Sequence, residues 1–314
     1  QHGIKVETRY QTGNPNSYQI TSNPFRAATA TAAGGEPTMG WTRSKSWNTG
    51  RKQQVETFSG AALPAPWGTN ANSTGVVTTD IDANATIVTD QAGKQRRSIS
   101  NALGQLIRVD EPDKTSGQLG SVTAPVQSTS YEYNSLGKMV HVQQGVQHRW
   151  FMYDSLGRLL RVKQPEQDIN GALDTTGNPG NNSWTAGFTY DNNGNVLTAK
   201  DAKNTQITNT YDALNRPLTR IYSDGTPTVT NSYDGAGMSP TPSFAKGKLT
   251  RVTSSVSESR YTSFDVAGRV KQFQQITDGQ TYTSSYDYNL SGALTKETYP
   301  SGRVVEDQYD ASGD

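Results

Sequence analysis

A short pattern, Tyr-Asp-x-x-Gly, recurs along most of this 314-residue chain and constrains its fold more than any other feature. The clearest copies run from Tyr153 to Leu159 and from Tyr211 to Leu218. First positions from Ser100 to Tyr309 are spaced by 33, 20, 37, 21, 22, 31, 24 and 21 residues, which indicates a unit of about 20 to 24 residues with three insertions. The repeat positions are Tyr133, Gly137, Tyr153, Asp154, Gly157, Tyr190, Asp191, Gly194, Tyr211, Asp212, Asn215, Tyr233, Asp234, Phe264, Asp265, Gly268, Tyr288, Gly292, Tyr309, Asp310 and Gly313.

Each unit has the residues of a β-hairpin. The Asp or Asn can accept backbone N–H bonds inside a turn, and the Gly, or Asn215 in one copy, supplies a positive φ. Short β-prone runs such as 159–162 and 217–221 flank the turns. A lone hairpin is marginally stable in water, so neighbouring hairpins must pair edge to edge. The predicted fold is all-β: consecutive antiparallel β-hairpins in one continuous curved or spiralling sheet.

The composition fits a sheet without a deep core. Hydrophobic residues, Tyr included, are 32 % of the chain, and on the scale that omits Tyr and counts Gly the share is about 37 %, against about 45–50 % in ordinary domains. A net charge of +1 gives no indication of a nucleic-acid partner, and the absence of Cys excludes disulfides and thiolate chemistry. No apolar stretch reaches the roughly 20 residues of a membrane-spanning helix.

The Tyr-Asp-x-x-Gly-Arg-Leu units resemble the YD repeats of the Rhs family. This family includes bacterial Rhs and wall-associated proteins, the B and C shell components of insecticidal toxin complexes, and animal teneurins. The resemblance covers Ser100 to Asp314 and implies a long β-sheet that spirals into a hollow shell. In bacterial members such a shell often encloses a C-terminal toxin and is processed near an Asp-Pro-x-Gly-Leu motif, which does not occur here.

The chain is expected to have two parts. Residues 1–99 read as diverged repeats that continue the same sheet, with a separate domain as the alternative, and residues 100–314 form the YD-repeat array, truncated inside its last repeat. Two insertions, 164–184 and 235–246, interrupt the array. Long loops without strand character are functional or mobile.

His141 and His148 are the pair that invites a metal-binding hypothesis. A two- or four-residue hairpin whose tip is Gln144–Gly145 would place the two imidazoles opposite each other. A metal site needs further ligands, which the sequence does not identify, so a structural cross-strand pair is favoured. We therefore assign no metal, cofactor or catalytic residue.

Three other features carry weaker alternatives. Asp191–Asn195 resembles the start of an EF-hand calcium loop. Its Gly comes earlier than in such a loop and the bidentate Glu at the end of the loop is missing, so a turn is favoured. The loop from Asp168 to Asn182 has oxygen ligands for loosely held calcium. Trp67 and Trp184 are expected to be exposed and, with the Tyr residues, could stack on sugar rings, although repeat packing is favoured as the explanation of the Tyr residues.

The leading functional hypothesis is a structural YD-repeat segment of a bacterial, secreted or cell-surface protein. It would form part of a β-shell around a toxin or other cargo, with the rest of its own polypeptide as the main partner. The alternatives are an adhesion or carbohydrate-binding module with a glycan or protein receptor, and a fibre built by head-to-tail self-association through open sheet edges. An enzyme, a nucleic-acid partner and a membrane span are not expected.

Overall fold

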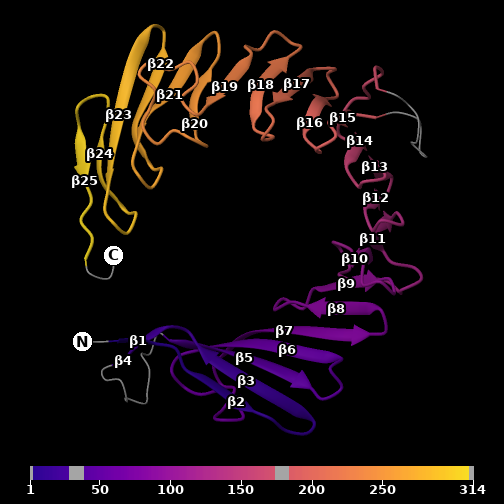
Figure 1. Cartoon of the computed structure of the whole chain (residues 1–314). Helices are drawn as coiled ribbons and strands as arrows, with labels where there is room; N and C mark the ends of the chain where they lie inside the picture. Colours follow the sequence, from indigo (N-terminus) through magenta and orange to yellow (C-terminus); the bar gives the residue numbers. More distant parts are fainter. Residues whose placement is uncertain (1–2, 28–38, 174–183, 311–314) are drawn as a thin grey trace. The chain divides into compact units, whose positions relative to one another are not determined.

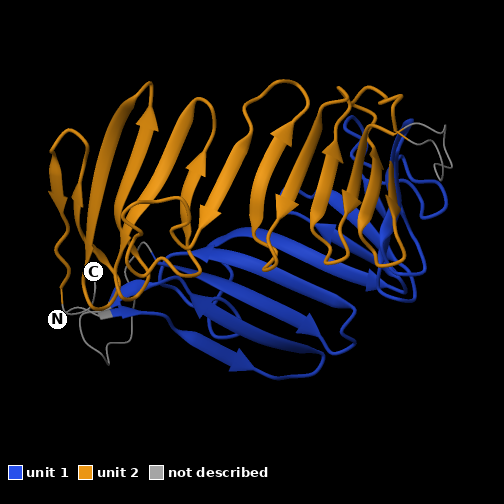
Figure 2. Cartoon of the chain, turned by 45° about the horizontal axis from the view of Figure 1, so that its top comes forward, with its two compact units in different colours: residues 1–149 blue, residues 150–314 orange. Residues whose placement is uncertain are grey.

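The computed structural model describes residues 3–27, 39–173 and 184–310, which contain β-strands and turns and no helix. The predicted all-β array of consecutive antiparallel hairpins is therefore confirmed. Within these ranges no helix is long and apolar enough to cross a membrane. The chain divides into two compact units, Gln1–Arg149 and Trp150–Asp314 (Figure 2).

Unit 1 is a run of antiparallel strands in which each main-sheet strand pairs with its neighbour along the chain, from β2 to β3, then β5 and onward to β12. A separate small sheet is formed by β1 and β4 (Figure 1). The strands are β1 Gly3–Lys5, β2 Thr8–Gln11, β3 Asn16–Ser22, β4 Phe25–Ala27, β5 Gly40–Trp47, β6 Lys52–Ser59, β7 Ser73–Asp82, β8 Ala85–Thr89, β9 Gln95–Ser100, β10 Leu106–Glu111, β11 Gln127–Tyr133 and β12 Met139–Gln144.

The predicted division at residue 99 stays a prediction. What the strand pairing does show is that β9 pairs with β8 on one side, from Ala85–Ile99 to Thr89–Gln95, and with β10 of the first recognisable repeat on the other, from Arg97–Asp110 to Ser100–Leu106. The diverged segment and the first recognisable repeat therefore share one sheet at this point.

Unit 2 contains the regular hairpins, side by side in chain order (Figure 2). Each strand pairs antiparallel with the next, from β13 to β25. β13 begins just before the unit boundary. The strands are β13 Gln147–Tyr153, β14 Leu159–Lys163, β15 Ala186–Tyr190, β16 Val196–Lys200, β17 Gln206–Tyr211, β18 Pro217–Tyr222, β19 Val229–Tyr233, β20 Leu249–Thr253, β21 Ser257–Phe264, β22 Val270–Thr277, β23 Gln280–Tyr288, β24 Leu294–Thr298 and β25 Val304–Glu306.

Most strand side chains in unit 2 are only half-buried, on both faces of the sheet. Threonine hydroxyls pair across neighbouring strands, as between Thr189 and Thr198 (2.6 Å) and between Thr210 and Thr219 (2.7 Å). Such pairs contribute about 0.2–1 kcal/mol each. The low apolar content thus corresponds to a sheet held by many weak lateral contacts.

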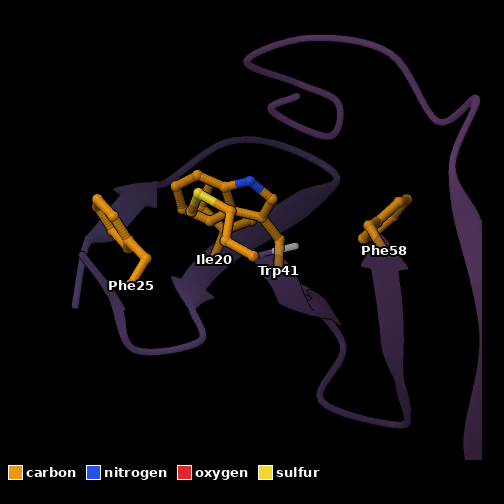
Figure 3. Close-up of a cluster of buried hydrophobic side chains, with 5 residues drawn as sticks. Ile20, Phe25, Trp41 and Phe58 are labelled. Carbon is orange, nitrogen blue, oxygen red and sulfur yellow. The ribbon is translucent and has the colours of Figure 1, made fainter. Parts of the chain in front are cut away.

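A small hydrophobic core lies in unit 1, where β3, β4, β5 and β6 each contribute one large side chain. Ile20, Phe25, Trp41 and Phe58 are at most 6 % exposed and cluster with Met39 (Figure 3). Trp67 is partly buried against this cluster.

Candidate functional site

The repeated feature with a defined geometry is the turn after each Tyr. We call Asp154–Arg158 and its equivalents the YD turn. Oδ1 of Asp154 accepts the backbone N–H groups of Leu156 (3.0 Å) and Arg158 (2.9 Å), and Gly157 has a φ of 77°. A non-glycine residue in this left-handed conformation costs about 1–2 kcal/mol. The same pair of bonds to one side-chain oxygen is formed by Asn101, Asn134, Asp191, Asp212 and Asp265.

Two turns of this kind lack the tyrosine of the repeat, and the first of them coincides with the turn that the sequence indicates at 91–95. Asp90 and Asp201 each accept the same pair of backbone N–H bonds, but no Tyr precedes either of them. Asn204 takes the place of the glycine in the second turn, with a φ of 64°. The signal that could have found both is Asp followed three residues later by Gly or Asn, without the Tyr.

The insertion at 235–246 lies inside a YD turn. Asp234 donates its N–H to the Lys248 carbonyl (3.0 Å), and its Oδ1 accepts the N–H of Gly247. Gly247, with a φ of 79°, therefore closes the turn, rather than Gly237 as the Tyr-Asp-x-x-Gly spacing indicates. Extra residues are accommodated because the ends of the turn keep their hydrogen bonds.

Arginine at the last position of the YD turn uses the second carboxylate oxygen. Nε of Arg158 donates to Oδ2 of Asp154 (2.6 Å), and Arg216 and Arg269 repeat this bond with Asp212 (2.7 Å) and Asp265 (2.6 Å). The backbone N–H of the same arginine is the main cause that lowers the pKa of each of these three carboxyl groups below its ordinary value. The carboxylates thus stay ionised and hydrogen-bonded within the turn.

At most of the described repeat positions, the tyrosine joins its hairpin to the preceding one. The Tyr190 hydroxyl donates to the carbonyl of Leu159 (2.7 Å), the first residue after the preceding YD turn. We call this contact the tyrosine latch. Burial raises the pKa of Tyr190, which keeps the hydroxyl in the protonated form that can donate. The latch recurs from Tyr133 to Leu106, Tyr211 to Val196, Tyr233 to Pro217, Tyr288 to Val270 and Tyr309 to Leu294, at 2.8–3.1 Å.

The YD-turn arginine reinforces the latch. The Arg158 guanidinium lies 5.0 Å from the Tyr190 ring centroid, and its Nη1 donates to the Asp191 carbonyl (2.9 Å). Arg216 lies 4.3 Å from the Tyr233 ring and Arg269 lies 4.7 Å from the Tyr288 ring. A cation over an aromatic face contributes about 0.5–1 kcal/mol at exposed sites. One hairpin is therefore tied to the next by a hydroxyl–carbonyl hydrogen bond and by an arginine stacked on the tyrosine ring.

Not every repeat position takes part in this way. Phe264 is buried, 5 % exposed, and has no hydroxyl, so the ring alone occupies that position. Asn215 has a φ of 60° in place of glycine, and its Oδ1 accepts the side-chain N–H groups of Asn193 (3.0 Å) and Asn195 (2.8 Å). Gly313 lies outside the described residues.

His141 and His148 contact each other, but the predicted turn is displaced by one residue. β12 extends to Gln144 and the turn is Gly145–Val146, so a two-residue hairpin places Gln143, not His141, across from His148. Nε2 of His141 lies 2.9 Å from Nδ1 of His148, with ring planes 2° apart. Nδ1 of His141 lies 3.3 Å from Oε1 of Glu132.

These distances describe a linear hydrogen-bonded pair. One ring nitrogen donates to the other, and the carboxylate lies on the far side of His141. Within 3–27, 39–173 and 184–310, no three His, Cys, Asp or Glu side chains are grouped so that they could hold a metal ion.

The expectation that Trp184 could be an exposed sugar platform is wrong. Trp184 is 1 % exposed, and its carbonyl accepts the N–H of Asn170 (2.9 Å), which anchors the first part of the insertion. Asn170 also donates from Nδ2 to the Asp201 carbonyl (2.6 Å). A tryptophan with no accessible face cannot stack on a saccharide. Residues 174–183 of the hypothetical calcium loop lie outside the described part of the chain.

Comparison with known proteins supports the repeat assignment. Residues 113–231 match the family described as Teneurin YD-shell. No curated protein sequence matches the chain significantly. These residues contain the YD turns from Asn134 to Asp212, so the resemblance to the Rhs/YD-repeat family is confirmed.

Solved structures extend the likeness in fold to nearly the whole chain. The crystal structure of TcdB2-TccC3 aligns with a TM-score of 0.59 at 13 % identity over 98 % of this chain. The crystal structure of TcdB2-TccC3-Cdc42 aligns with a TM-score of 0.58 at 12 % identity over 95 % of this chain. This chain spans about a fifth of the length of those chains, 20 % and 19 % respectively.

Proposed function

We propose that this chain, a run of YD repeats of the Rhs type, forms part of the wall of a secreted or cell-surface β-shell that encloses a toxin or other cargo polypeptide. The observation that carries the proposal is the tyrosine latch, because it ties successive hairpins by the same contact at the same repeat position. The match to the Teneurin YD-shell family and the fold shared with TcdB2-TccC3 support it.

The wall acts mechanically rather than chemically. The YD turn fixes each hairpin, and the latch and the stacked arginine join it to the one before, so the sheet can be lengthened unit by unit. Half-buried polar side chains on both faces suit a sheet that is wetted on its inner and outer sides. The proposed role is non-enzymatic, which is supported by the use of the turn carboxylates in holding the turns.

Small-angle X-ray scattering on the purified chain over a concentration series tests the shell-segment proposal. A compact body of this length has a radius of gyration of roughly 20 Å. An open wall segment gives a larger, concentration-independent value. A value near the compact one refutes an open wall segment and favours a self-contained binding module, and growth with concentration favours the fibre alternative.

Enclosure is tested by limited proteolysis of the native polypeptide that carries this segment. A cargo inside the wall resists trypsin until the wall is opened, so replacing two latch residues, Tyr190→Ala and Tyr211→Ala, should expose it. Tyr282→Phe is the control, because Tyr282 is exposed and forms no latch. If trypsin digests the cargo equally fast in the parent, in the variant with both latch tyrosines replaced and in the Tyr282→Phe control, enclosure is contradicted.

A further inference from the structure

The insertion in the Asp234 turn covers part of the sheet in unit 2. Gly235 donates its N–H to the fully buried Thr250 hydroxyl (3.1 Å), and Ala245 is 4 % exposed, so both ends of the insertion are anchored. Between it and two neighbouring strands lies a groove of about 440 Å³. Its walls include Met238 and Pro240 of the insertion, Arg260 and Thr262 of β21, and Gln272 and Gln274 of β22.

Charge at the groove is positive. Glu258 Oε1 accepts from Nε of both Arg251 and Arg260, so two guanidinium groups share one carboxylate and leave one positive charge among the three side chains. A carboxylate carries the single negative charge that balances this set. A phosphate dianion would leave excess negative charge beside Glu258. Nε and Nη2 of Arg260 donate to Oε1 and Oε2 of Glu258, the second bond at 3.1 Å, so the N–H groups left to face a ligand carboxylate are those of Nη1 and the second N–H of Nη2.

Two glutamines provide amide groups at the floor. Oε1 of Gln272 accepts from the Thr262 hydroxyl (2.8 Å), and Nε2 of Gln274 donates to the Thr283 hydroxyl (3.4 Å). Among the described residues, the other amide atom of each glutamine has no hydrogen-bond partner and can bind a ligand: Nε2 of Gln272 as a donor and Oε1 of Gln274 as an acceptor. An extended peptide presents both kinds of backbone group.

The lining disfavours a saccharide. No aromatic side chain is present among the described residues that line the groove, so a sugar ring has no stacking surface. Met238 and Pro240 instead offer an apolar wall for an aliphatic side chain.

The geometry points to a binding site for an acidic polypeptide segment. Arg260 binds a Glu or Asp carboxylate of that segment, Gln272 and Gln274 bind its backbone, and the insertion packs against a neighbouring aliphatic side chain. This site does not depend on the shell proposal, because every residue in it belongs to one loop and two adjacent strands of unit 2.

Fluorescence anisotropy with the intact chain tests the site. The probe is a labelled short peptide of alternating Glu and Leu, compared with its Gln–Leu analogue. Binding of the Glu peptide should weaken with added salt, and Arg260→Gln should weaken it at least about tenfold. Gln274→Ala should also weaken binding without disturbing the ion pairs, so it separates recognition from folding.

Arg220→Gln is the matched control. Arg220 lies with Asn209, Thr219 and Asn231 in a groove of about 420 Å³ whose described lining comes from strands β17, β18 and β19, and its substitution should leave binding unchanged. Equal binding of the two peptides, no binding at millimolar concentration, or equal losses in the Arg260 and Arg220 variants overturns the proposal. Tighter binding of an oligogalacturonate than of the Glu peptide also overturns it, in favour of an acidic saccharide.

Discussion

The tyrosine latch can be measured by removing one hydroxyl. Tyr190→Phe deletes the bond to the Leu159 carbonyl (2.7 Å) and keeps the ring that Arg158 stacks on. A typical intramolecular hydrogen bond contributes about 0.5–1.5 kcal/mol, and a half-buried carbonyl can regain water, so we expect a loss of about 1 kcal/mol. For a unit of this size that corresponds to a fall in Tm of roughly 2–4 °C.

Thermal and urea unfolding followed by tryptophan fluorescence provide the assay. Tyr282→Phe is the control, since Tyr282 lies in the same unit, is 46 % exposed and forms no latch. Tyr190→Leu should cost more than Tyr190→Phe because it also removes the ring beneath Arg158. A Tyr190→Phe protein that unfolds like the parent, or a Tyr282→Phe protein that loses as much, would refute the role of the latch.

Three further predictions concern the turns, an ion pair and a buried ring. Gly157→Ala should lower the free energy of unfolding by about 1–2 kcal/mol because φ is 77° there, whereas Gly171→Ala, at an open position without a positive φ, should have little effect in the same urea titration. Hydrogen bonds from Arg251 and Arg260 lower the pKa of Glu258 from its ordinary value of 4.5 to about 2. The ion pairs therefore stabilise the folded chain fully above pH 4.5, and this stabilisation is lost as the pH falls through the folded pKa of about 2. Glu258→Gln should therefore flatten the pH dependence of the urea midpoint between 4.5 and about 2, and an unchanged slope would contradict the ion-pair assignment. Trp184→Ala should cost about 3–5 kcal/mol, because the side chain is 1 % exposed, and Trp184→Phe clearly less; a calorimetric Tm unchanged in both would contradict its burial.

Local chemistry made the hairpins predictable. The turn at Asp154–Arg158 needs a side-chain acceptor followed by a residue that tolerates a positive φ, and both requirements are met by residues close in sequence. The same local rule explains why Asn215 can replace Gly. The all-β repeat fold could therefore be predicted from spacing and turn residues alone.

The contacts between neighbouring hairpins were not predictable from the same information. Tyr190 finds its acceptor, Leu159, 31 residues earlier, and only the pairing of β14 with β15 brings that hairpin beside it. The two anchored ends of the 235–246 insertion likewise determine that Gly247 closes the turn. Sequence periodicity gives no information on the bonds across such an insertion.

The amino-acid sequence by itself determined the repeat, its turns and the all-β class, because each depends on interactions within a few residues. Tertiary structure alone decided that Trp184 is buried, that His141 meets His148 through a displaced turn, and that Arg260 faces an anchored loop across a groove. These features depend on the register between strands and on the path of inserted segments. A one-residue shift in either changes which side chains meet, while the local turn pattern stays the same.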